Sequence, residues 1–345
     1  MSRSEQRRSD ILDAVVGLHI ETGQPVGSAL VSRSLCGDLS PATIRAVMVG
    51  LEHEGLLLQP HTSAGRVPTD DGYRAYVDRL LALRRFRADT QPRELRRHVE
   101  RRLQRHIGTP AIGKALAELL SELTTNVSII LSPSWDGARA LRLDLYPKDG
   151  RRILMVLVLE HALVRSGVFH AARDYPPEAV EQAAALLSER LAGRTVAEIR
   201  DRILPGIDAA VSPAHRCASD LATQGRELFA DFEEGEIELD GVGRVLEQPE
   251  FSDPERLKSL IRFLESPRQM RDALHRLTSA RAEGIAVWIG AENPVSGLRP
   301  FSLLCAGFEA GGRRGVLAVL GLRRMPYPRA VSGLDVLLGT LRSLS

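Results

Sequence analysis

The sequence predicts an α+β protein, with helical segments first and strand segments on both sides of a later helical block. Three observations predict this fold. Residues 1–83 carry apolar side chains at helical spacing, interrupted by glycines. Strand-like runs occur between residues 127 and 169 and return between 285 and 321. The stretch between them, about 175 to 247, has a helical pattern, so we expect one α+β domain interrupted by an insertion.

Composition bounds the class of protein. The chain has 345 residues, of which 43% are hydrophobic and 26% charged, and its net charge is +2. These values are typical of a globular protein and exclude a disordered chain, a collagen-like repeat or a disulfide scaffold. No apolar run approaches a membrane span, and no signal peptide follows the polar N-terminus. The odd number of well-separated cysteines suits a reducing compartment, so we expect a cytoplasmic protein.

The third predicted helix is the clearest element of the sequence. A first helix ends at Gly23, and a second begins at Ser28. The third begins with Ser40, a good N-cap, and with Pro41 at the first helical position, and Gly55 ends it. Its predicted buried stripe consists of Ile44, Val47, Met48 and Leu51.

The outer face of this third helix is small and nearly uncharged, which is unusual for a solvated helix. At about 100° per residue, the outward side chains are those of Ala42, Ala46, Val49 and His53, with Thr43 and Arg45 beside them. Small side chains let a helix lie close to base edges, and Arg45 can reach guanine or phosphate. A helix buried on both faces is the alternative, but the opposite stripe already supplies a core contact. The pattern therefore favours a DNA recognition helix.

A hairpin follows the third helix. Residues 56–59 can form a strand, and a polar loop with glycine and proline comes next. Two helices joined by a tight turn and followed by a hairpin are the layout of a winged helix-turn-helix. In the loop, Gly65 lets the backbone approach phosphates closely. The predicted DNA contacts are Ser28, Ser40, Ala42, Thr43, Arg45, Ala46, Val49, His61, Thr62, Ser63 and Arg66.

Charge gives no separate support for DNA binding. Residues 1–90 contain eleven arginines and eleven acidic residues, so no strong basic footprint exists and affinity would depend on local charge and dimerisation. In the whole chain, 43 of the 46 basic residues are arginine. A GC-rich genome explains this excess, and phosphate recognition is the functional alternative.

No enzymatic motif is present. The sequence has no phosphate-binding Walker loop, no G-x-S-x-G, no H-E-x-x-H and no C-x-x-C, so we expect no catalytic residue, no metal and no cofactor. Cys217 and Cys305 are interpreted as small buried apolar side chains. Arg323 and Arg324, after the last strand, are interpreted as a surface pair, with anion binding as the alternative.

Two N-terminal runs carry a specific resemblance. "TGQPVGSALVSRSL" and "LSPATIRAVMVGLEHEGLLLQPHTSAGRVPTDDGYRAYVDRL" resemble the HrcA family of heat-inducible transcription repressors. The resemblance continues at Asp240-Gly241, at 247–251, in "WIGAEN" (288–293) and in "GVLAVLGLRRMPY", which ends at Tyr327. It therefore extends, in order, over most of the chain.

The resemblance implies a homodimeric repressor of chaperone operons. It implies a winged-helix domain at 1–83, a linker helix at 84–110, a GAF-like domain at 111–174 and 248–345, and an inserted dimerisation domain at 175–247. The family binds double-stranded DNA at an inverted-repeat operator called CIRCE, and the chaperonin GroEL supports the operator-binding form. Heat occupies the chaperonin with unfolded clients, and repression is lost.

Two departures from the family pattern are visible. The usual motif S-P-A-T-I-R-N-V-M has Asn where this chain has Ala46, so a side chain that could pair with adenine is absent. The usual I-G-P-T-R-M is replaced by residues 320–325, L-G-L-R-R-M, so the Pro-Thr turn is lost.

Two other functions remain as alternatives. A ligand-gated regulator would use the GAF-like domain as a receptor for a small molecule. A GAF-related enzyme with an accessory DNA-binding domain would need a cluster of perturbed titratable groups in a deep pocket.

Overall fold

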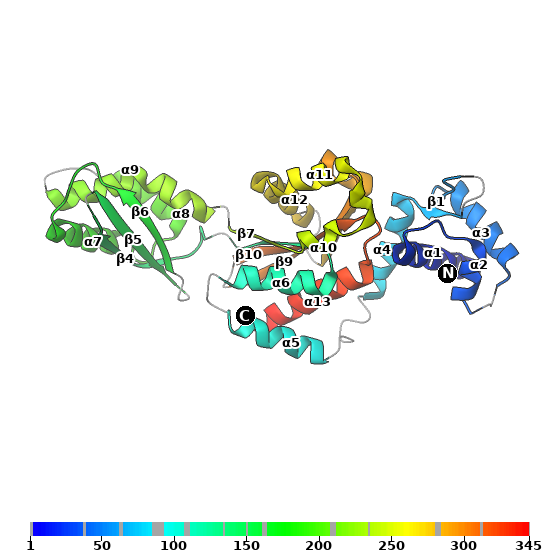
Figure 1. Ribbon diagram of the computed structural model, residues 1–345. Helices are drawn as coiled ribbons and strands as arrows, with labels where there is room; N and C mark the ends of the chain where they lie inside the picture. Colours follow the sequence, from blue (N-terminus) through cyan, green and yellow to red (C-terminus); the bar gives the residue numbers. More distant parts are fainter. Residues whose placement is uncertain are drawn as a thin grey trace.

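Three units lie in a row (Figure 1). The computed structural model describes residues 3–36, 39–61, 65–84, 93–106, 111–133, 135–149, 151–160, 164–207, 212–233, 235–279, 284–310 and 313–344. We call the three the N-terminal unit, the central unit with its five-stranded sheet, and the outer unit with its three-stranded sheet. None of the described helices is long and apolar enough to cross a membrane. Because helices and antiparallel sheets occur together in the chain, it is an α+β protein.

The N-terminal unit consists of helices packed with a short hairpin. Its elements are α1 (Arg3–Thr22), α2 (Ser28–Ser34), α3 (Pro41–His53), β1 (Leu57–Leu58), β2 (Val67–Pro68) and α4 (Asp70–Arg84). The strands β1 and β2 pair antiparallel. Gly23 and Gly55 follow α1 and α3 with positive φ angles of 67° and 77°, as expected for glycines after a helix. The predicted element order of this unit is confirmed.

A common core joins the helices of the N-terminal unit. Ile11, Val15 and Val16 of α1 are fully buried, and Val77 of α4 is buried with them. The α3 residues in this core are Ile44, Met48 and Leu51, with Val47 partly buried beside them. The apolar stripe predicted for α3 therefore faces inward.

The central unit is built on an antiparallel sheet of order β7-β3-β10-β9-β8. The strands are β3 (Val127–Leu131), β7 (Ile237–Asp240), β8 (Ile285–Ile289), β9 (Phe301–Ala310) and β10 (Arg313–Leu322). Side chains alternate between the two faces, so Leu317 and Val319 lie in one core and Ala318 and Leu320 in the other. Both faces of the sheet are thus covered.

Helices cover each face of the central sheet. On one face lie α6 (Ile112–Thr124) and α13 (Tyr327–Leu344). The other face carries α11 (Pro254–Leu264) and α12 (Pro267–Ser279), with α10 (Val242–Leu246) nearby. Short 3-10 helices η3, η4 and η5 occupy Pro249–Ser252, Gly290–Glu292 and Ser296–Leu298.

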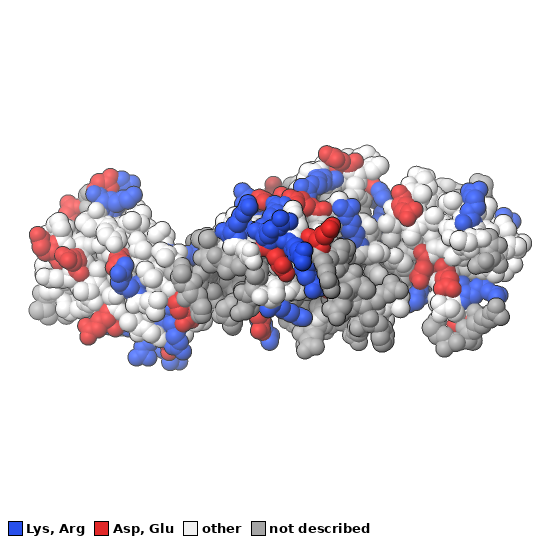
Figure 2. Space-filling view, turned by 90° about the horizontal axis from the view of Figure 1, so that it is seen from below, with Lys and Arg blue, Asp and Glu red and all other residues white. Residues whose placement is uncertain are grey.

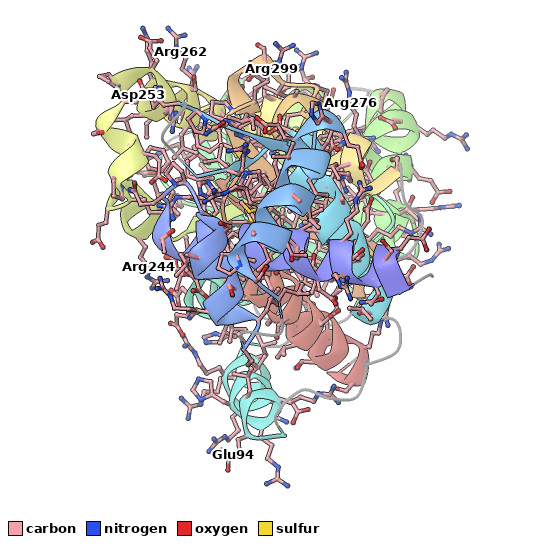
Figure 3. All side chains as sticks on the ribbon, turned by 90° about the vertical axis from the view of Figure 1, so that its right-hand side faces the viewer. Glu94, Arg244, Asp253, Arg262, Arg276 and Arg299 are labelled. Carbon is pink, nitrogen blue, oxygen red and sulfur yellow. The ribbon has the colours of Figure 1, made fainter. Side chains whose placement is uncertain are left out.

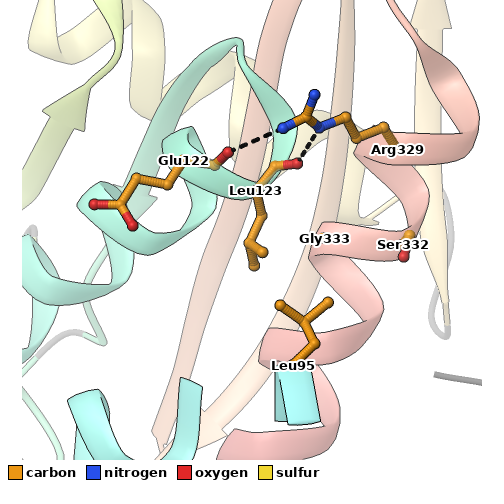
Figure 4. Close-up of a pocket in the computed structure, with 6 residues that line it drawn as sticks. All are labelled: Leu95, Glu122, Leu123, Arg329, Ser332 and Gly333. Carbon is orange, nitrogen blue, oxygen red and sulfur yellow. Dashed lines mark hydrogen bonds between the residues drawn. The ribbon is translucent and has the colours of Figure 1, made fainter. Parts of the chain in front are cut away.

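The arginine-rich helix after the N-terminal unit packs against the central unit. In α5 (Arg93–Gln104), Val99 and Leu103 are fully buried in the core that contains α6 and α13. Arg329 of α13 donates to the carbonyl oxygens of Leu123 (2.7 Å) and Glu122 (3.4 Å) at the end of α6 (Figure 4). A small cavity of about 270 Å³ lies beside this contact. The helix expected within 84–110 is thus a docked element.

The outer unit has a sheet of its own. The strands β4 (Ala140–Pro147), β5 (Arg152–Leu159) and β6 (Val164–His170) pair in that order. One face of this sheet is covered by α7 (Pro177–Leu191), α8 (Val196–Glu198) and α9 (Pro213–Glu233), with η1 (Ile199–Ile203, a π-helix) and η2 (Leu204–Gly206) between them. All members of this core lie between residues 138 and 221.

Strand pairing differs from the sequence interpretation in one respect. We expected the strands within 141–169 to belong to the same domain as the C-terminal strands, with the insertion limited to 175–247. The structure pairs them only with one another and packs them against α7 and α9. The segment outside the central sheet therefore runs from the end of β3 at Leu131 to the start of β7 at Ile237.

Candidate nucleic-acid interface

The start of α3 is fixed by its first side chains. Ser40 Oγ accepts a hydrogen bond from the Thr43 backbone N–H at 3.1 Å, and the two side-chain hydroxyls lie 2.9 Å apart. Pro41 occupies the first helical position. The cap satisfies one of the free N–H groups at the start of the helix. The predicted N-cap is confirmed, and both hydroxyls lie at an exposed helix end.

The outer face of α3 is accessible. Ala42, Thr43, Arg45 and Ala46 are exposed, as is His53, whereas Val49 is half-buried. Arg45 forms no ion pair with any described residue. One face of α3 therefore packs in the core, while the other presents small side chains and the exposed guanidinium of Arg45.

The hairpin is braced against the rest of the N-terminal unit. Arg66 exchanges two backbone hydrogen bonds with Val26, at 2.8 and 2.9 Å. Its guanidinium donates to Glu52 Oε2 of α3 at 2.9 Å through Nε. A Cβ atom at Gly65 would lie 2.4 Å from the Val26 carbonyl carbon and oxygen. Gly65 is thus explained by packing inside the unit, and Arg66 joins the hairpin to α3.

The remaining predicted contacts fall into three groups. Ser28, the first residue of α2, is buried, with 8% of its surface exposed, so its side chain is poorly placed for DNA. His61 is exposed at the hairpin loop. Thr62 and Ser63 lie outside the described residues.

Charges on the N-terminal unit are mixed. Figure 2 shows acidic and basic side chains side by side on the visible face of this unit, at the right of the view. Basic side chains gather instead over the middle of the molecule. In the central unit, Arg97 and Arg101 of α5 are exposed, as is Arg105 just after the helix. DNA binding through α3 would therefore depend on close fit more than on a broad positive field.

Two charged pairs join α4 to the central unit. Asp70 Oδ1 accepts from the Arg323 guanidinium at 2.8 Å, and Asp70 Oδ2 accepts from the Ala291 backbone N–H at 2.9 Å. One turn later, Arg74 Nε donates to Glu292 Oε1 at 2.8 Å. Arg323 therefore binds an anion, a carboxylate of the same chain. Sequence reasoning missed these pairs because their members are more than 200 residues apart.

A second arginine lies next to this contact. The Arg324 guanidinium forms an ion pair with Glu250 and donates to the Ile20 carbonyl of α1 at 3.3 Å. Hydrogen bonding from Arg324 lowers the pKa of the Glu250 carboxyl. Neither Arg323 nor Arg324 is thus a free surface charge.

Tyrosines fill the space between α4 and the C-terminal helix. The rings of Tyr73 and Tyr76 lie 6.0 and 6.5 Å from that of Tyr327. The Tyr327 hydroxyl donates to the Arg323 carbonyl at 2.7 Å and lies 2.7 Å from Ser302 Oγ. Burial raises the pKa of both Tyr73 and Tyr327. The N-terminal unit is therefore held by an aromatic contact with charged pairs beside it.

The three-stranded sheet of the outer unit has an open face that is largely apolar and that also carries the Arg142–Asp144 ion pair. Tyr146, Val164 and Val168 are more than 40% exposed, and Leu154, Val156 and Val158 are half-buried. The register aligns Tyr146, Leu154 and Val168 in one row across the three strands. Large exposed apolar patches are typical of interaction surfaces.

The two cysteines expected in the interior are confirmed there. Cys217 and Cys305 are fully buried. Burial raises the pKa of the Cys217 thiol to about 12 and that of Cys305 well above its ordinary value. Both thiols are therefore protonated at neutral pH, which suits packing rather than nucleophilic chemistry.

Comparison with known proteins assigns the family. The model for the HrcA protein C-terminal domain matches residues 112–331. Heat-inducible transcription repressors HrcA of Geobacter sulfurreducens and Moorella thermoacetica are 34% and 33% identical, covering 97% and 99% of this chain and 96% and 99% of their own. A crystal structure of a protein described only as hypothetical shares the fold, with a TM-score of 0.67, 24% identity and coverage of 98% of this chain and 97% of its own. These curated relatives are named as repressors, a regulatory rather than an enzymatic role, and this chain belongs to the HrcA family of heat-inducible transcription repressors.

Proposed function

We propose that this protein represses chaperone operons by binding a CIRCE-type inverted-repeat operator as a homodimer. The observation that carries the proposal is the face of α3 with exposed Ala42, Thr43, Arg45 and Ala46. Such a face fits the floor of the major groove, where small side chains touch thymine methyl groups and arginine binds guanine. Ser40 and His61 lie at exposed positions suited to phosphate contacts.

The open face of the outer sheet supports the dimer. An inverted repeat presents two equivalent half-sites, so a repressor with two-fold symmetry matches it. The row formed by Tyr146, Leu154 and Val168 gives each copy an apolar surface that a second copy would bury. In this proposal the outer unit is the inserted dimerisation domain, the N-terminal unit the winged helix and the central unit the GAF-like domain.

We infer the role of GroEL from the family resemblance alone. The chaperonin supports the operator-binding form, and heat withdraws that support when unfolded clients occupy the chaperonin.

The alternative, a regulator gated by a small molecule, is disfavoured by the packing of the central unit. Phe251 and Phe301 stack at 6.0 Å between the sheet and its helices, and Phe263 is buried with them. Apolar side chains thus fill the core between this face of the sheet and its helices, where a small-molecule receptor would need a cavity.

A gel-shift titration tests the proposal. Purified protein is titrated against an inverted-repeat duplex, with and without GroEL, and from low to heat-shock temperature. We expect saturable binding that GroEL strengthens and that falls on heating. A duplex with scrambled half-sites is the DNA control.

Substitution of Arg45 distinguishes specific recognition by α3 from the general attraction of DNA to positive charge. Arg45→Ala should weaken binding by about ten- to a hundredfold without a change in thermal stability, since Arg45 has no partner among the described residues. Arg314→Ala is the matched control, because Arg314 is 89% exposed at the tip of the β9–β10 hairpin of the central unit. Equal affinity of a folded Arg45→Ala protein would exclude the assigned role of α3.

A further inference from the structure

The first two turns of α4 hold opposite charges that the central unit matches. Asp70 binds Arg323 and the Ala291 N–H, while Arg74 binds Glu292 and donates to the Val287 carbonyl at 2.8 Å. We call Asp70, Arg74, Glu292 and Arg323 the ionic clamp. Their side chains are between 25% and 47% exposed, so the clamp lies at the edge of the interface.

The clamp specifies one orientation of α4. Along the helix the charge order is negative at Asp70 and positive at Arg74, and the central unit offers Arg323 and Glu292 in the matching order. A shift of α4 by one turn would bring Arg74 toward Arg323, and like charges repel. Glu292 is itself fixed, because its Oε2 accepts the Ile289 N–H at 2.8 Å.

The orientation of α4 determines that of the recognition helix. Tyr73 of α4 is buried in one continuous core with Leu51 of α3 and with Tyr327 of α13 in the central unit. At the junction, a Cβ atom on Gly72 would lie 2.1 Å from the Leu56 carbonyl oxygen, so hairpin and helix are in close contact. Because packed cores resist deformation, the position of α4 on the central unit sets the position of α3.

The geometry points to the ionic clamp as a positioning device that fixes the recognition helix relative to the central unit. Partly exposed ion pairs are individually weak and are screened by salt, so the clamp can open while the buried contact between Tyr73 and Tyr327, which is apolar and less directional, persists. Opening replaces one orientation of α3 by many, and a dimer then loses its fixed half-site spacing. The link to affinity rests on the proposed operator binding.

The clamp also includes a position at which this chain departs from the family motif given above. Arg323 stands where the family motif has the Thr of its Pro-Thr turn. Arg323→Thr therefore removes one pair from the side of the central unit and leaves the N-terminal unit unchanged. Because Arg323 lies outside α4, this variant tests the clamp without changing the sequence of that helix.

The orientation can be measured without DNA. Cys36 is exposed in the N-terminal unit, and Cys217 and Cys305 are fully buried, so a spin label reacts at Cys36. The second label is placed at Arg299→Cys, an exposed site at the periphery of the central unit (Figure 3). Dilution with unlabelled protein restricts the measured distances to one chain.

Three variants are compared with one control in the full-length protein. Asp70→Asn, Arg74→Gln and Arg323→Thr each remove a clamp charge. Asp71→Asn removes the neighbouring charge in the first turn of α4, where Asp71 has no partner among the described residues. We expect a narrow distance distribution for wild type and Asp71→Asn, and a broad one for the three clamp variants. We also expect operator affinity about three- to tenfold lower for the clamp variants.

The outcomes distinguish the clamp from the proposed function. An unchanged distance distribution in folded Arg323→Thr and Arg74→Gln proteins overturns the clamp, whatever happens to DNA binding. Broad distributions with wild-type affinity for the operator overturn the coupling between clamp and α3. Failure of the wild type to bind any inverted repeat overturns the proposed function, while the distances still decide whether the clamp exists.

Discussion

Arg66 of the hairpin and Glu52 of α3 form an ion pair in which both Nε and a terminal nitrogen of the guanidinium lie within 2.9 Å of one carboxylate oxygen. The Arg66 side chain is only 14% exposed, so the pair is partly desolvated. The sequence placed Arg66 among the phosphate contacts, whereas its bonds to Val26 and Glu52 connect the hairpin to α3. These two roles of Arg66 predict opposite effects of a Glu52 substitution on operator affinity.

Glu52→Gln should reduce both stability and operator affinity. Loss of the ion pair should lower the free energy of unfolding by about 0.5–1 kcal/mol, because the charge on Arg66 loses its partner. Denaturant titration and gel shifts measure the two effects. If Glu52→Gln binds the operator more tightly, Arg66 contacts phosphate, and the ion pair with Glu52 competes with that contact.

Ala46→Asn should strengthen operator binding. Ala46 is exposed on α3, and an asparagine there can form two hydrogen bonds with an adenine edge. We expect an affinity gain of about tenfold, measured by gel shift on the inverted repeat. Ala46→Leu is the matched variant, because its bulk prevents close approach and should weaken binding. Equal affinities for all three proteins would place Ala46 away from the DNA.

Val168→Asp should produce monomers. Val168 is 41% exposed on the open face of the outer sheet, and a buried unpaired carboxylate would oppose association there. Light scattering coupled to size-exclusion chromatography measures the mass. Gln182→Asp adds the same charge on the exposed side of α7, where a dimer should persist. A dimeric Val168→Asp protein would exclude this face as the interface.

Stability of the N-terminal unit should fall as the pH is lowered from 7 to 5. Burial lowers the pKa of His19, whose Nδ1 lies 2.9 Å from the Gln24 carbonyl oxygen. Below the ordinary value of 6.5 the unfolded chain binds a proton before the folded chain does, so unfolding is favoured. The Glu250 carboxyl, whose pKa is lowered from 4.5, adds a further loss only at lower pH.

His19→Gln isolates this contribution. The variant should show a smaller decrease in melting temperature between pH 7 and pH 5 than the wild type, measured by circular dichroism. An identical decrease in both proteins would assign the acid sensitivity to other groups.

Interactions between residues close in sequence made the N-terminal unit predictable. Ser40, Pro41 and the apolar stripe of α3 specify the bounds of that helix within a few neighbouring residues. The strands around 127–131, 153–159 and 285–289 were similarly visible as apolar runs, and all three are present. The exposed face of α3, which carries most of the candidate contacts, follows from the same helical period.

Pairing between distant segments was not predictable. The strand β5 was expected in the same domain as the C-terminal strands, but it is the central strand of the three-stranded outer sheet. An apolar run shows that a strand is buried without showing which strand pairs with it. The short strand β7 was not predicted, although its residues 237–240 alternate apolar and acidic side chains, because it lies within the stretch interpreted as helical.

The amino-acid sequence by itself thus determined the helices, the strands, the recognition face and the family. Only the tertiary structure decided that Arg66 joins the hairpin to α3, that Gly65 packs against Val26, and that Asp70 and Arg74 bind the central unit. The physical reason is the separation along the chain over which each interaction acts. Caps and periodicity act within a few residues, whereas the ion pair between Asp70 and Arg323 joins residues 253 positions apart and forms only where the N-terminal and central units meet.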